Sequence, residues 1–93
     1  MRRLYRVHHD GEWTDAMAQR PEEALDLVKN CWIAVLDSED FEYTFKDAEV
    51  QLLGYKERIT YLCDSGERVS LSVEDWLEML PTEFSYVWGS STW

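Results

Sequence analysis

The chain has 93 residues, 45% of them hydrophobic, and a formal net charge of −10 from 19 acidic and 9 basic side chains. A chain of this length forms one domain with a single core, and its apolar content is that of a folded protein despite the charge. A surface this acidic repels nucleic acid and anionic membranes and attracts basic partners. We therefore expect no direct binding to DNA, RNA or a membrane.

The N-terminal segment predicts a β-hairpin. Arg3 to His9 is typical of a strand, because its side chains alternate between two faces. Asp10-Gly11 is a dipeptide that favours a tight turn. We therefore expect Trp13 to Met17 to return as a short second strand, even though Asp15 is a poor strand former.

A helix is expected to follow from Pro21. Proline at the first helical position and two glutamates directly behind it are a typical helix start. Apolar residues then recur at helical spacing, which favours a helix to about Leu36. The alternative is that the helix ends at Asn30 and that Cys31 to Leu36 forms a buried strand. We prefer the longer helix, because the helical period continues without a break through Val35.

The middle of the chain predicts two more strands. After a polar, acidic link over residues 37–40, Phe41, Tyr43 and Phe45 alternate with polar residues, as in a half-buried strand. Val50 to Leu53 is expected to form a further strand. With the hairpin that follows, these two strands would make a four-strand antiparallel meander.

Residues 55–81 give the clearest prediction, which is a hairpin that leads into a helix. A two-residue loop in this hairpin would place apolar side chains opposite polar ones. A three-residue loop over residues 64–66 instead pairs Tyr61 with Val69 and keeps one apolar face. It also places Gly66 where such a loop needs a positive φ, so we predict the three-residue register.

Ser72 is expected to cap the helix after this hairpin, with Asp75 three residues on as its capping-box partner. Pro81 is expected to end the helix, because the residue before a proline avoids the helical region. An apolar stripe at helical spacing predicts the face that packs on the core, and it consists of Val73, Trp76, Leu77 and Leu80. We interpret Trp76 as a core anchor and not as a ligand-binding residue.

Residues 82–93 are an aromatic-rich tail or a last strand around Phe84 to Trp88. Trp93 is expected either to fold back onto the domain or to contact a partner. Together these elements predict a single compact α+β domain over residues 1–93. Its antiparallel sheet would have about four to six strands, with two helices packed on it.

No arrangement of residues indicates a chemical reaction. His8 and His9 are neighbours in a strand, so they point to opposite faces and do not converge on one metal ion. The chain has no nucleophile, phosphate-binding or dinucleotide-binding motif. We therefore expect a protein that is not an enzyme and that uses no metal and no cofactor.

The two cysteines, Cys31 and Cys63, lie in apolar runs and are expected to be buried free thiols in a reducing compartment. No run of apolar residues is long enough to span a membrane, and no export signal follows the N-terminal arginines. These features predict a cytoplasmic protein.

The charge distribution gives the functional prediction. Two groups of acidic residues have almost no basic neighbours, and we expect them to bind a partner. The first group is Asp37, Glu39, Asp40, Glu42, Asp47 and Glu49, and the second is Glu74, Asp75 and Glu78. Trp88 and Trp93 are the aromatic residues expected to join them. The alternative is that the acids only solvate the outer faces of the domain.

In its acidity, its small α+β build and its aromatic residues, the chain resembles the small acidic single-domain inhibitors that phages carry. These include the anti-CRISPR and anti-restriction proteins. The resemblance implies an inhibitor that acts in the host bacterial cytoplasm. It would occupy the basic nucleic-acid channel of a defence complex, with its carboxylates in place of the phosphates.

Two other functions fit the same residues. An immunity protein or antitoxin that neutralises a basic nuclease would use the same charges against one small enzyme. A structural or adaptor domain would instead self-associate as a homodimer through Phe84, Trp88 and Trp93, and its acidity would serve solubility.

Overall fold

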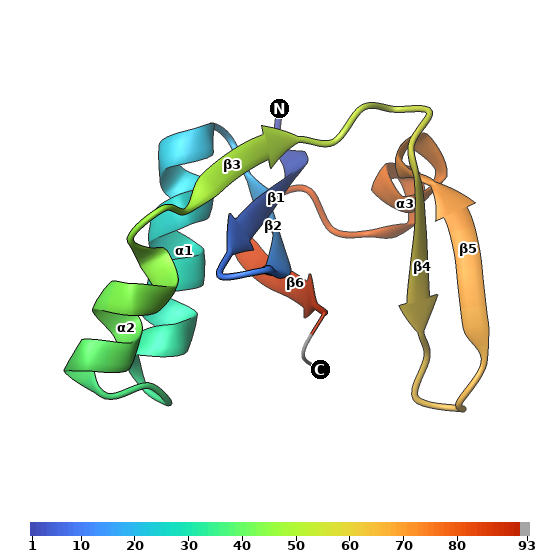
Figure 1. The fold of residues 1–93 in the computed structure, drawn as a ribbon. Helices are drawn as coiled ribbons and strands as arrows, with labels where there is room; N and C mark the ends of the chain where they lie inside the picture. Colours follow the sequence, from blue (N-terminus) through green and yellow to red (C-terminus); the bar gives the residue numbers. More distant parts are fainter. Residues whose placement is uncertain (92–93) are drawn as a thin grey trace.

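The computed structural model describes residues 1–91, over which the chain forms an α+β fold (Figure 1). This confirms the predicted fold class. The elements in chain order are β1 (Arg3–His9), β2 (Glu12–Ala18), α1 (Pro21–Ile33), α2 (Ser38–Phe45), β3 (Glu49–Leu52), β4 (Arg58–Leu62), β5 (Arg68–Ser72), α3 (Val73–Met79) and β6 (Tyr86–Ser90). Over the same residues, no helix is long and apolar enough to cross a membrane.

The centre of the fold is a four-stranded antiparallel sheet in the order β3-β1-β2-β6. The predicted hairpin of β1 and β2 is confirmed, with His9 opposite Glu12 and Arg3 opposite Ala18. Its turn residues both have positive φ, 49° at Asp10 and 77° at Gly11, as a type I′ hairpin turn requires. The last strand, β6, pairs with β2 at one edge of this sheet, so residues far apart in the sequence lie side by side.

Helix α1 packs against one face of this sheet, together with α2 (Figure 1). It ends at Ile33, and the N–H groups of Val35 and Leu36 still donate to the carbonyl of Trp32 at 3.0 Å. The expected helix to about Leu36 is therefore correct to within one turn, and the alternative strand over residues 31–36 is wrong. The core on this side consists of Tyr5, Val7, Ala16, Ala18, Ala24, Val28 and Phe45.

The strand expected over Phe41 to Phe45 is wrong, because these residues belong to helix α2. Asp37 caps this helix, and its Oδ1 accepts a hydrogen bond from the N–H of Asp40 at 2.9 Å. The rings of Phe41 and Phe45 lie 5.0 Å apart between centroids and face the core, while Tyr43 points to solvent. The aromatic residues at every second position predicted a strand instead of a helix, because Phe41 and Phe45, four residues apart, share a face in either structure.

The opposite face of the sheet is partly covered by the β4–β5 hairpin and α3 (Figure 1). The predicted register is confirmed, with Tyr61 opposite Val69 and with Gly66 at a φ of 85°. The side chain of Ser72 accepts a hydrogen bond from the N–H of Asp75 at 3.2 Å, which confirms the predicted cap of α3. The core on this side consists of Leu4, Met17, Leu53, Ile59, Val73, Trp76 and Leu77.

The predicted four-strand meander is wrong, because β3 does not pair with β4. Instead β3 pairs with the outer edge of β1, where Val50 lies opposite Val7. The N–H of Leu53 then donates to the carbonyl of Leu4 at 3.0 Å, and the chain crosses to the other face. The β4–β5 hairpin is therefore a separate two-stranded sheet.

The expected last strand exists and is shifted toward the C-terminus, over Tyr86–Ser90 instead of Phe84 to Trp88. Its pairing with β2 is interrupted at Trp88, which is the extra residue of a β-bulge. Trp93 lies outside the described residues.

Candidate functional site

The first predicted acidic group lies on α2 and the segment that leads into β3. Asp37 caps the helix, and Glu39 and Asp40 occupy its first turn, where the helix dipole favours negative charge. The carboxylates at the start of α2 thus stabilise the helix and also make its surface negative. The members of this group are all exposed, and they are Asp37, Glu39, Asp40, Glu42, Asp47 and Glu49.

This acidic group is extended by the β1–β2 turn, which the sequence did not associate with it. Because Glu49 pairs with His8, the end of β1 comes beside the start of β3. Asp10 and Glu12 then line a hollow of about 340 Å³ together with Asp47 and Glu49. We call the combined set the acidic edge, and it comprises Asp10, Glu12, Asp37, Glu39, Asp40, Glu42, Asp47 and Glu49.

The acidic edge forms no ion pair within residues 1–91, and two lysines, Lys29 and Lys46, line a hollow together with Glu39 and Glu42. Over residues 1–91, the one ion pair joins Arg6 to Asp15, on the other face of the sheet. Lys46 is the sole cation between Asp37 and Glu49, and it forms no ion pair with them. With eight carboxylates and two nearby lysines, the acidic edge keeps a net negative charge.

The second predicted acidic group is exposed on α3 and does not join the first. Figure 1 shows α2 and α3 at opposite ends of the molecule, with the four-stranded sheet between them. Glu74, Asp75 and Glu78 thus form a separate patch. A partner with one flat binding surface would contact one group or the other.

Of the two predicted aromatic contact residues, Trp88 is half-buried and packs against the core. Its ring stacks on Tyr61 at 5.2 Å between centroids and 13° between planes, and it meets the edge of Trp76 at 5.1 Å. Trp76 itself is the predicted core anchor, and its Nε1 donates to the carbonyl of Ile59 at 3.0 Å. An exposed aromatic that the sequence did not select is Tyr43 on α2, whose exposed fraction is 69%.

The buried ion pair lies on the sheet face that looks toward the β4–β5 hairpin. Asp15 is only 1% exposed, and its two carboxylate oxygens accept from Nε and Nη2 of Arg6 at 2.8 and 2.9 Å. The Arg6 guanidinium also lies 3.8 Å above the ring centroid of Trp13. Burial raises the pKa of Asp15, while the Arg6 hydrogen bonds and charge oppose that rise.

The histidines point to opposite faces, as predicted. His8 is exposed and bonds to the Gln51 side chain at 2.8 Å. His9 is 3% exposed, and its Nε2 lies 2.8 Å from Oγ1 of Thr14, which also accepts from Nε1 of Trp32 at 3.2 Å. Burial lowers the pKa of His9. In the part of the chain that the structure covers, no three His, Cys, Asp or Glu side chains are placed to hold a metal ion.

The two cysteines are free, and both are half-buried instead of fully buried as expected. Cys31 lies in the last turns of α1, and Cys63 follows β4 on the other side of the sheet. Each thiol thus belongs to a different layer of the fold.

Comparisons of the chain with protein-family models, with curated proteins and with solved structures found no match.

Proposed function

We propose that this protein is a non-enzymatic acidic inhibitor that binds a basic, nucleic-acid-binding surface of a bacterial defence complex. The observation that carries the proposal is the acidic edge, a set of exposed carboxylates that no ion pair within residues 1–91 neutralises. Like charges held together destabilise a domain by self-repulsion. Binding to a basic partner would explain why the domain holds so many like charges together.

The charge density on α2 supports imitation of a nucleic acid. Four carboxylates lie between positions 37 and 42, at Asp37, Glu39, Asp40 and Glu42. Glu39, Asp40 and Glu42 lie within three helical steps, which rise about 4.5 Å, and Asp37 adds its charge just before the first turn. Double-stranded DNA carries about one charge per 1.7 Å of axis. A groove that binds phosphates through lysine and arginine would meet closely spaced negative charges here, which point to different sides of α2.

The attachment of the carboxylates to regular elements also supports the proposal. Most are held by the helix α2, by the cap at Asp37 or by the paired strand β3. Fixed charges lose little freedom when they bind, in contrast to charges on a loose tail. Electrostatic attraction of this kind chiefly raises the association rate, and it weakens as salt screens it.

Self-association through the C-terminal aromatics is the weaker alternative, because Trp88 already stacks within the domain. An immunity protein against a basic nuclease shares the physics of the proposal. The two differ only in the partner, which is a multi-subunit defence complex in one case and a single small enzyme in the other.

Charge reversal on the acidic edge tests the proposal. Glu42→Lys/Asp47→Lys changes two exposed residues that cap no helix. The matched control is Glu78→Lys/Glu83→Lys, which makes the same change in charge beside α3. The assay measures inhibition of nucleic-acid binding by a panel of purified bacterial defence nucleases and nuclease toxins.

The unchanged protein is expected to inhibit at least one member of the panel, and the identity of that member decides between a defence inhibitor and an immunity protein. The acidic-edge variant should lose inhibition while the α3 control keeps it. Equal inhibition by both variants, or none by the unchanged protein, would contradict the proposal.

A further inference from the structure

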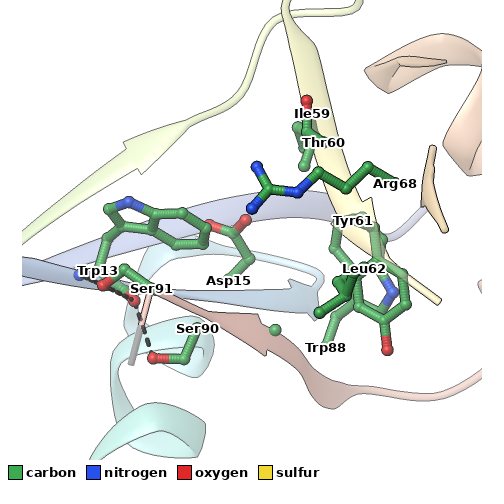
Figure 2. A pocket seen from close by; sticks show the side chains of 11 residues that line it. Trp13, Asp15, Ile59, Thr60, Tyr61, Leu62, Arg68, Trp88, Ser90 and Ser91 are labelled. Atoms are coloured by element: carbon green, nitrogen blue, oxygen red, sulfur yellow. Dashed lines mark hydrogen bonds between the residues drawn. The ribbon is translucent and has the colours of Figure 1, made fainter. Parts of the chain in front are cut away.

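A cleft separates β4 from the β2–β6 side of the four-stranded sheet (Figure 2). It has a volume of about 400 Å³, which falls within the range of small-molecule sites. The residues that matter for its chemistry are Trp13, Asp15, Thr60, Tyr61, Arg68 and Trp88. The cleft opens on the sheet face opposite α1 and α2, so it is independent of the site proposed above.

The cleft has a positive charge in a chain whose net charge is −10. Its one acidic lining residue, Asp15, is matched by Arg6, which occupies both carboxylate oxygens. That leaves Arg68 without a counter-charge. Figure 2 shows the Arg68 side chain extending from the hairpin toward Trp13 and Asp15.

The Arg68 guanidinium has no hydrogen-bond or ion-pair partner among residues 1–91. Its planar fork of donors matches the two oxygens of a carboxylate. An amine in the same place would face Arg68 and would find both oxygens of Asp15 already bonded. A negative group would therefore fit the cleft better than a positive one.

Aromatic side chains form the walls of the cleft. Tyr61 and Trp88 lie on one side of the cleft, where their rings stack nearly parallel, and Trp13 lies toward the other side (Figure 2). The Arg6 guanidinium lies above the ring of Trp13. Aromatic walls of this kind favour a flat, apolar ring. We propose that the cleft binds a small planar aromatic molecule that carries a carboxylate, with its ring between the aromatic walls and its carboxylate on Arg68.

Three probes that share the indole ring system and differ in charge test the proposal: indole-3-acetate, its neutral amide indole-3-acetamide, and the cation tryptamine. Binding is followed by NMR through the indole N–H signals of the protein. Signals of Trp13 and Trp88 should shift on addition of indole-3-acetate, because both rings line the cleft. The signal of Trp32, which packs on the other face of the sheet, should stay in place.

The decisive variant is Arg68→Glu, with Lys56→Glu as the matched control. Both residues are exposed, and Lys56 does not line the cleft. Indole-3-acetate should bind at least about tenfold more weakly to Arg68→Glu, as expected when a charged hydrogen bond is lost, and this variant should prefer tryptamine. Lys56→Glu should behave like the unchanged protein. Either no saturable shift at millimolar indole-3-acetate or equal affinity in Arg68→Glu would overturn the proposal.

Discussion

Removal of Arg6 from its pair with Asp15 should destabilise the domain severely. In Arg6→Leu, Asp15, which is 1% exposed, would stay buried and its carboxylate would lose both hydrogen bonds from arginine. Breaking a buried pair in this way costs about 3–5 kcal/mol. A domain of 93 residues has a free energy of unfolding of only roughly 5–14 kcal/mol. The variant should therefore lose a large part of its stability.

Urea unfolding followed by tryptophan fluorescence measures this loss. With a slope of about 1.5 kcal/mol per molar urea, the midpoint should fall by roughly 2–3 M. The double variant Arg6→Leu/Asp15→Val removes the stranded charge as well, so it should be more stable than Arg6→Leu alone. Lowering the pH should also recover part of the loss in the single variant, because burial raises the pKa of Asp15 and the protonated form is favoured in the fold. A double variant less stable than the single one would refute this reasoning.

Three further predictions concern stability. Burial lowers the pKa of His9, so the stability that its neutral ring contributes should be present above about pH 6.5 and lost as pH falls. His9→Gln should therefore flatten the pH dependence of thermal stability between about pH 7.5 and 5.5, and an unchanged dependence would contradict this assignment. Gly66→Ala should lower the free energy of unfolding, measured in urea, by about 1–2 kcal/mol, because φ is 85° there. Gly54→Ala should lower it less, because the added Cβ would meet the Glu57 side chain at an ordinary contact distance of 3.6 Å. Asp37→Ala should lower the free energy of unfolding by about 1 kcal/mol and reduce the helical circular dichroism signal, because α2 loses its cap. Asp37→Asn should keep both the stability and the helical signal, and equal losses in the two variants would show that the cap is not the cause.

Features set by neighbouring residues were predictable from the sequence. The turn at Gly66 fixed the register of β4 with β5, and Ser72 marked the start of α3. The buried ion pair could also have been predicted from the sequence. A two-residue turn at Asp10-Gly11 places Arg6 directly opposite Asp15, so the pair follows from the register of the first hairpin.

The helix α2 was missed because its aromatic pattern fits two periods. Phe41 and Phe45 fall on one face in a strand and in a helix alike, and only the exposed Tyr43 distinguishes the two. A local signal was present in Asp37, an N-cap residue directly before the acidic first turn.

Features set by distant residues were not predictable. The pairing of β3 with β1 joins strands that are separated by two helices, and no local rule selects it over a meander. The acidic edge depends on this pairing, because it brings Asp10 and Glu12 beside Asp47 and Glu49. The cleft likewise depends on the hairpin packing across the sheet.

The most direct test of the central claim is the association rate with the nuclease that the panel identifies, measured by stopped flow at low and high salt. Steering by the acidic edge predicts a fast rate that falls at least about tenfold as salt rises. Glu42→Lys/Asp47→Lys should associate slowly at both salt concentrations, while Glu78→Lys/Glu83→Lys should match the unchanged protein. A rate that depends neither on salt nor on the acidic-edge substitutions would contradict the account.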